Sequence, residues 1–327
     1  MQNQMSETQK EFAKAARNAL AKNCTLEHVS SVYEAHRVGS SACVERSAIR
    51  RGVEEVGAFG ILVPEDVGGV GLTEVEALLF CYEAGYAALP LPIASTLWSA
   101  PILAATGVVQ PDAWASVAMV QADGRVAYCT DADYLLDFCA DGASIRRVLD
   151  VDEVDDVVDW ARPVGSVVPG DLTLQIGQRE ADQARVFMKL GSAAYMLGLA
   201  QRALDLTVEY VTDRVQFGVP VGSFQAVKHQ LADAHIAIAS SEPVLWHASA
   251  SLSRAFSELE LASAQLLIGR AAMKVGRVAI QCHGGMGYTT EYPLHLICKR
   301  IWSVEGVMGE RDKNVFRIAD HLGLNSI

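Results

Sequence analysis

A three- and four-residue spacing of apolar side chains runs through residues 180–213 and restricts this stretch to one long helix. Similar helical patterns cover residues 224–252, 258–282 and 294–321, and glycine-containing turns separate them. Helices of this length bury their apolar faces by packing together. The sequence therefore predicts a C-terminal four-helix bundle over residues 179–327. The positions that share one face of the first helix are Leu190, Ala193, Ala194, Leu197, Gln201, Leu204, Val208 and Val211.

The first third of the chain has a helix-forming composition and one well-marked helix start. Thr73 and Glu76 have the spacing of a capping box, and the helix that follows is predicted to run towards Ala88. We therefore expect residues 1–110 to form a helical domain. Residues 111–178 contain short β-type runs separated by Asp-Gly and Asp-rich turns, which predicts a small β domain. Other helical stretches expected in the first domain are residues 7–22, 45–58 and 93–106.

Composition excludes several classes of protein. The formal net charge of −12 argues against a nucleic-acid partner, because phosphates attract basic surfaces. No apolar run approaches the length of a membrane-spanning helix, and the N-terminus has no signal-peptide core, so we expect a cytoplasmic protein without a membrane span. The seven cysteines include no CxxC pair, and no metal site is predicted.

Two glycine-containing motifs in the predicted bundle have the chemistry to bind a dinucleotide. The first reads RVQFG at residues 214–218, and the second reads QCHGGMGYTTE at residues 281–291. Glycines let a backbone approach a pyrophosphate, and the Arg214 guanidinium offers a planar fork of donors to phosphate oxygens. A glycine-rich helix end is by itself often an ordinary terminus, so the hypothesis depends on the two motifs together.

Together these motifs resemble the C-terminal helical domain of the acyl-CoA dehydrogenase family. The segment LVPEDVGGVGL at residues 62–72 resembles the family's first helical domain, so the likeness covers residues 1–105 and 180–322. The resemblance implies an acyl-CoA dehydrogenase-like fold with FAD as cofactor. It also implies that the two motifs contact the ADP half of FAD across a subunit interface. The cofactor-binding residues that it implies are Arg214, Gln216, Phe217, Gln281, Gly284 and Gly285.

The reaction implied by the resemblance is α,β-dehydrogenation of an acyl-CoA thioester. A carboxylate removes the α-proton while a hydride leaves Cβ for the flavin. In much of the family this base is a Glu followed by Gly and Thr in the last long helix, and Glu305-Gly306-Val307 is similar. However, the interval from Pro293 to Glu305 is about three residues shorter than the family pattern, which displaces the carboxylate by nearly one helical turn. Glu305 is the candidate catalytic residue, or a vestige of one.

The predicted β domain lacks the segments that hold the flavin ring in the family. It contains no Thr-Glu-Pro segment followed by Gly-Ser, and no segment resembling Trp-Ile-Thr. Residues that would serve a neighbour's FAD are thus kept, while those that would serve the chain's own FAD are missing. This pattern, with TEYPLHL at residues 290–296, resembles one subunit of the bacterial α2β2 dehydrogenases of steroid side chains. The partners implied are an unlike acyl-CoA dehydrogenase subunit, a cholesterol or bile acid side-chain CoA ester, and an electron-transfer acceptor.

Two alternatives remain open from the sequence. One is a homo-oligomeric acyl-CoA dehydrogenase that uses Glu305 as its base, and the other is a non-catalytic helical interaction protein without flavin.

The remaining polar features have simpler interpretations. The acidic run between Asp150 and Asp159 is interpreted as a solvated face, and His283 and His295 as hydrogen-bonded polar or ligand-edge residues rather than metal ligands.

Overall fold

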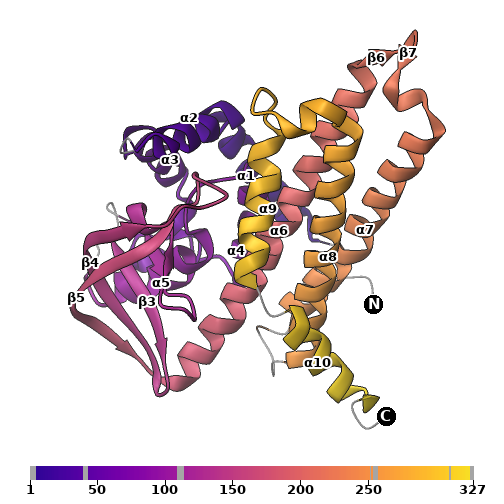
Figure 1. Cartoon of the computed structure of the whole chain (residues 1–327). Coiled ribbons are helices and arrows are strands. Elements are labelled where there is room, and N and C mark those ends of the chain that lie inside the picture. The colour runs from indigo at the N-terminus through magenta and orange to yellow at the C-terminus, as the bar shows by residue number, and fades with distance from the viewer. Residues whose placement is uncertain are drawn as a thin grey trace.

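The chain folds into a helical N-terminal part, a small sheet and a C-terminal helical bundle, and the long helix α6 (Gln178–Asp213) runs between the sheet and the bundle (Figure 1). The predicted fold class, mainly helical with a small β domain, is confirmed. No helix in the part of the chain that the structure covers is long and apolar enough to cross a membrane. The residues that the computed structural model describes are 5–39, 43–108, 114–250, 252, 257–308 and 311–324.

The N-terminal part contains a helix that the sequence pattern did not predict. Its capping box pairs Thr25 with His28, whereas the usual partner at that position is Glu or Gln. The predicted capping box at Thr73 is present, since the Glu76 carboxylate accepts a hydrogen bond from the Thr73 backbone N–H. The five helices are α1 (Glu7–Asn23), α2 (Leu26–Arg37), α3 (Cys43–Glu55), α4 (Glu74–Tyr86) and α5 (Ile93–Ala105).

The middle sheet has five strands in the order β1-β3-β4-β5-β2. The β1–β3 pair is parallel, and the other pairs are antiparallel. A bridge from Val120, just after β1, to Val126 in β2 connects the two edge strands, so the sheet curves back on itself. The strands are β1 (Val117–Met119), β2 (Val126–Ala127), β3 (Tyr134–Cys139), β4 (Gly142–Val154) and β5 (Val164–Ile176).

The bundle contains the four predicted helical stretches, and the last of them is described as two helices on either side of residues 309 and 310, which the structure does not describe. The long helix α6 crosses α4 at two glycines: a Cβ on Gly198 would lie 2.0 Å from the Tyr82 carbonyl oxygen, and one on Gly85 would lie 1.9 Å from that of Tyr195. The two backbones therefore meet without intervening side chains, which fixes α6 against the N-terminal part. The other bundle helices are α7 (Gln225–Ser249), α8 (Glu258–His283), α9 (Leu294–Met308) and α10 (Arg311–His321).

Candidate functional site

The two glycine-containing motifs lie at the same end of the bundle (Figure 1). The first forms a hairpin between α6 and α7, and the second forms the 3-10 turn η5 (Gly284–Tyr288) after α8. Three aromatic rings that pack against one another join the ends of α6 and α8 beneath them. The ring of Tyr210 stacks on that of His283 at 4.2 Å, and the Tyr292 ring lies 4.9 Å from His283. This packing holds the two motifs at a defined separation.

The hairpin presents Phe217 to solvent on a tight turn. Strands β6 (Val215–Gln216) and β7 (Val219–Pro220) pair antiparallel, and Phe217 and Gly218 between them both have positive φ, at 54° and 81°. Two-residue hairpin loops favour this conformation, but a bulky aromatic residue in it costs roughly 1 kcal/mol. The Phe217 side chain is 93% exposed, so burial within this chain does not offset that cost. An exposed aromatic in a strained turn is suited to a contact outside the chain.

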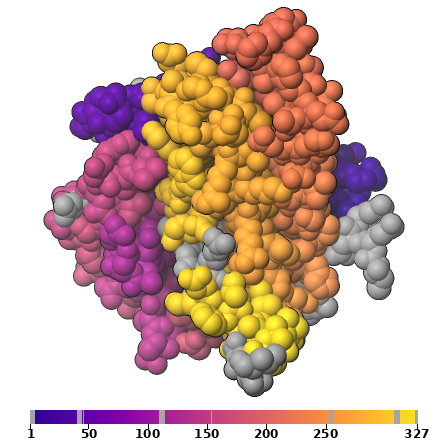
Figure 2. Space-filling view, turned by 45° about the vertical axis from the view of Figure 1, so that its right-hand side comes forward, coloured from indigo at the N-terminus to yellow at the C-terminus, as the bar shows by residue number. Residues whose placement is uncertain are grey.

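All six candidate cofactor-binding residues are exposed at this end of the bundle. No hydrogen bond or ion pair of the Arg214 side chain is found among the described residues, while the Gln216 amide bonds only to the Val215 carbonyl, at 2.8 Å. A Cβ added to Gly284 or Gly285 would meet nothing within 4 Å, so the backbone there is open to a ligand. Figure 2 shows the surface of both segments at the top of the same face. Exposed donors beside open glycine backbone fit a phosphate-bearing group that docks from outside.

Helix α9 carries the candidate base. Glu305 is half-buried. Its neighbour Val304 lines a cavity between α6, α5 and the sheet, but Glu305 does not. The structure therefore does not bring Glu305 together with the exposed motif residues at the end of the bundle.

A buried ion pair lies where the sheet, α6, α9 and the N-terminal part meet. Arg300 on α9 bonds to Asp159 through Nε, and both side chains are 1% exposed. Its Nη1 donates to the Tyr195 hydroxyl at 2.6 Å and to the carbonyls of Ala88 and Leu89. Burial acts to lower the pKa of Arg300, but Asp159, Tyr195 and Tyr128 together raise it well above its ordinary value. The interpretation of Asp159 as part of a solvated acidic face is thus wrong, because it is the counter-ion of a buried guanidinium.

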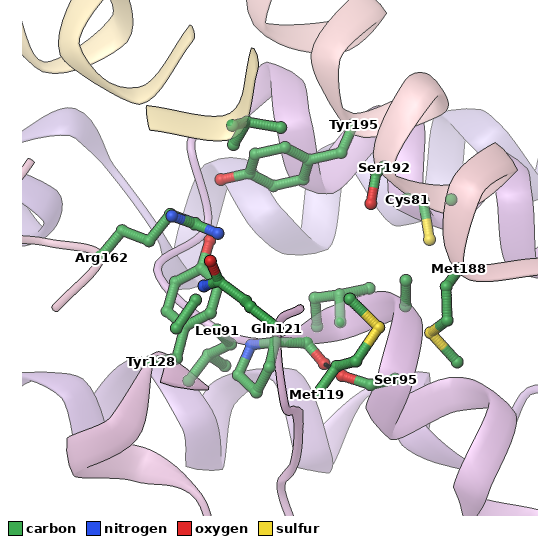
Figure 3. A pocket seen from close by; sticks show the side chains of 16 residues that line it. Cys81, Leu91, Ser95, Met119, Gln121, Tyr128, Arg162, Met188, Ser192 and Tyr195 are labelled. Carbon is green, nitrogen blue, oxygen red and sulfur yellow. Dashed lines mark hydrogen bonds between the residues drawn. The ribbon is translucent and has the colours of Figure 1, made fainter. Parts of the chain in front are cut away.

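A second guanidinium lies in the same region and faces the cavity (Figure 3). Arg162 follows β4 in the loop that leads to β5, and it is 5% exposed. Its Nη1 donates to the Ser303 hydroxyl on α9 at 2.9 Å. The loop between β4 and β5 is therefore bonded to α9 at two points, through Asp159 and through Arg162.

Comparison with known proteins identifies the family. Residues 181–322 match the family described as "Acyl-CoA dehydrogenase, C-terminal domain", and residues 6–114 match "Acyl-CoA dehydrogenase, N-terminal domain". The chain belongs to the acyl-CoA dehydrogenase family. Acyl-CoA dehydrogenases are oxidoreductases that act on acyl-CoA thioesters.

Relatives and solved structures agree with this assignment. The chain is 32% identical over 261 residues to acyl-CoA dehydrogenase IpdE2 of Mycobacterium tuberculosis, covering 76% of this chain and 77% of that protein. A variant of the Tcur3481-Tcur3483 steroid ACAD superposes with a TM-score of 0.80 at 23% identity, covering 98% of this chain and 99% of that one. PigA with FAD and proline superposes with a TM-score of 0.80 at 18% identity, covering 99% and 100%. At these identities the two structures show that the fold is shared.

The region between the sheet and α9 does not fit a flavin ring in this chain. By resemblance to the family, the ring is held by the β domain and lies beside the base of the last long helix. Here the Arg300–Asp159 and Arg162–Ser303 contacts join those two elements directly. The cavity beside them has about 100 Å³ of space. A cavity of roughly 150 Å³ is needed to take benzene, so the tricyclic isoalloxazine is too large for it.

The residues at this junction were not predicted as functional, although one signal for them exists in the sequence. Asp159 lies in VVDWA, where the flanking residues are apolar, and a carboxylate in such a run is usually buried with a cationic partner. Arg162 has no such signal, since its burial follows from the packing of its loop on α9.

The two histidines, predicted as hydrogen-bonded polar or ligand-edge residues, each keep one ring nitrogen without a partner among the described residues. His283 donates from Nδ1 to the Ala279 carbonyl at 2.8 Å, but its Nε2 is buried without a partner, as is Nδ1 of His295. No group of three or more metal-ligating side chains exists among the residues with described positions.

Acidification is expected to destabilise the motif end of the bundle through His283. Burial lowers the pKa of His283 below its ordinary value, and the bond to Ala279 only partly opposes this. The unfolded chain therefore binds the proton more tightly, so the stability that neutral His283 contributes is present above pH ~6.5 and is lost as the pH falls below it. His283→Phe keeps the ring stack but cannot titrate. Chemical denaturation at about pH 7.5 and about pH 5.5 measures how much unfolding free energy each protein loses on acidification. We expect the His283→Phe variant to lose ~1 kcal/mol less than wild type. If the exposed His229→Gln variant also lost that much less than wild type, the assignment to His283 would be wrong.

Proposed function

We propose that this chain is one subunit of an FAD-dependent acyl-CoA dehydrogenase whose complete site requires an unlike partner subunit, in an α2β2 assembly. The observation that supports this most is the contrast between the two halves of the expected flavin site. The exposed motif end offers donors and open backbone, whereas the loop between β4 and β5 is bonded to α9 where the chain's own flavin ring would lie. The partner then supplies the catalytic base and the residues that hold the ring.

In this proposal the chain holds the ADP half of FAD. Arg214 would donate to pyrophosphate oxygens, Gln281 would donate to or accept from the same group, and Gly284 and Gly285 would let it approach the backbone. Phe217 and Gln216 on the hairpin would complete the contact. When bound, FAD would serve as the hydride acceptor for the substrate, and its electrons would pass to an electron-transfer acceptor. The exposed side chains support this arrangement because they face away from the chain's own core.

The substrate that we propose is a steroid side-chain CoA ester. The likeness to a solved steroid ACAD, together with the TEYPLHL segment that resembles that branch, supports a bulky acyl group. The cavity of about 100 Å³ beside Arg162 is far too small for a steroid, and in this proposal the acyl pocket lies in the partner. This proposal is tested by measuring which acyl-CoA esters reduce the flavin of the purified complex. Reduction by a steroid thioester but not by a short-chain ester is the expected result.

Glu305 is expected to be dispensable for catalysis. It does not line the cavity, and α9 is bonded to the sheet loop beside it. Glu305→Gln in the complex should therefore leave kcat within about twofold of wild type. A loss of the 10²- to 10⁴-fold typical of a missing general base would instead support the homo-oligomeric alternative, in which Glu305 removes the α-proton. Steady-state kinetics with reduction of an artificial electron acceptor measures either outcome.

A further inference from the structure

The cavity is lined by Arg162, a buried guanidinium that forms no ion pair of its own among the described residues. Two ion pairs are buried nearby, Arg300 with Asp159 and Arg46 with Asp131. Arg162 has no carboxylate within ion-pair distance among the described residues, and its side-chain hydrogen bonds within them go only to Ser303. The neighbouring Arg300 adds like charge, which the attraction of Asp159 only partly offsets. A buried charge without a close counter-ion is unfavourable, so an anion bound beside it would stabilise the fold.

The cavity also contains an unsatisfied donor on the same side as Arg162. Nε2 of Gln121 is buried and has no hydrogen-bond partner. Figure 3 shows Gln121 and Tyr128 close to the Arg162 guanidinium, with the Met188 and Cys81 side chains across the cavity. The guanidinium, an amide N–H and a phenol hydroxyl are the donors that a carboxylate or similar oxyanion accepts from. Buried polar groups in native proteins normally have partners, so an unpaired amide nitrogen beside a guanidinium without an ion-pair partner indicates a ligand.

The side of the cavity across from Arg162 carries the Cys81, Met119 and Met188 side chains, with the hydroxyls of Ser95 and Ser192 beside them (Figure 3). The space of about 100 Å³ corresponds to roughly three water volumes, which is room for a molecule of on the order of three to five heavy atoms. A polar end for an oxyanion and an apolar end for a short alkyl chain describe a small carboxylic acid.

We infer that this cavity binds the carboxylate of a small acid, with Arg162 as its counter-ion, Gln121 and Tyr128 as further donors, and the methionine side around its alkyl chain. The site is separate from the exposed motif end and does not depend on flavin or on the partner subunit. Arg162 thus has a ligand role as well as its bond to Ser303.

Calorimetric titration of the intact protein, in its native assembly, with sodium propionate at constant ionic strength tests this inference. Wild type is expected to bind propionate saturably and to bind propionamide, which has the same shape without the charge, at least tenfold more weakly. Benzoate should not bind, because its ring exceeds the cavity. Absence of propionate binding, or equal binding of propionamide, would overturn the inference without any variant.

Variants then assign the binding to this site. Arg162→Gln should weaken propionate binding at least tenfold, and Arg162→Lys should recover part of it because the charge remains. The matched control is Arg185→Gln, which changes a half-buried arginine of α6 outside the cavity and should leave the affinity unchanged. Unchanged affinity in Arg162→Gln would place the ligand elsewhere and reject the site.

A competition experiment distinguishes two sources of the carboxylate. If succinyl-CoA competes with propionate, the carboxylate is the free end of an acyl group; if it does not, the ligand is a free acid.

Discussion

Arg214→Ala in this chain is expected to weaken FAD binding by the complex roughly 10- to 100-fold, although the partner subunit is unchanged. The exposed guanidinium is assigned to pyrophosphate oxygens, and a hydrogen bond to a charged group contributes about 1.5–3 kcal/mol. Gln281→Ala should have a smaller effect in the same direction, because a neutral amide contributes about 0.5–1.5 kcal/mol. The measurement is the flavin retained per complex during dilution, followed by FAD fluorescence.

The matched control is Arg270→Ala, which removes an exposed arginine from α8 more than three turns before the motif. This variant should retain FAD like wild type. Arg214→Lys should fall between wild type and Arg214→Ala, since an ammonium keeps the charge but not the planar fork. If Arg214→Ala and Arg270→Ala retained FAD equally well, the assignment of the ADP half to this end of the bundle would be wrong.

Asp159→Ala is expected to lower the free energy of unfolding by about 3–5 kcal/mol, because it leaves the Arg300 guanidinium buried without its counter-ion. Urea denaturation monitored by circular dichroism measures the change. The loop between β4 and β5 also loses one of its two bonds to α9 in this variant, so the sheet should become easier to cleave by protease.

The exposed Arg125–Asp123 pair provides the comparison for this prediction. Its side chains are 51% and 47% exposed, so Asp123→Ala should cost less than about 1 kcal/mol. The double variant Asp159→Leu with Arg300→Met should recover most of the stability, since apolar residues of similar volume can replace a buried ion pair. A cost for Asp159→Ala as small as that for Asp123→Ala would show that the buried pair does not hold the junction together.

The sequence predicted the arrangement of helices and sheet because the signals for them are local. The capping box at Thr73 and the apolar spacing from Leu190 to Val211 depend on residues within a few turns of one another. The missed helix α2 has an unusual cap, with His28 in the position of the usual acid or amide. The last predicted helix, 294–321, corresponds to α9 and α10, and residues 309 and 310 between them lie outside the described residues.

The candidate site was predictable only in part. RVQFG and the glycine motif are compact, so their residues were identified without knowing how α6 and α8 pack. The junction between the sheet and α9 joins Asp159 and Arg162 to Arg300 and Ser303, about 140 residues away along the chain. No local pattern encodes such a contact. For this reason the sequence indicated that flavin-ring residues were missing but not what occupies their place.

The visible absorption spectrum and assembly mass of the purified chain, alone and co-expressed with its candidate partner subunit, test the central claim most directly. The account predicts a colourless protein when the chain is purified alone, and a yellow complex containing both subunits with flavin absorption when they are co-expressed. Stoichiometric flavin in the chain alone would contradict it, because the region between the sheet and α9 would then have to open to admit the ring. A colourless complex would also contradict it and would favour a helical interaction protein.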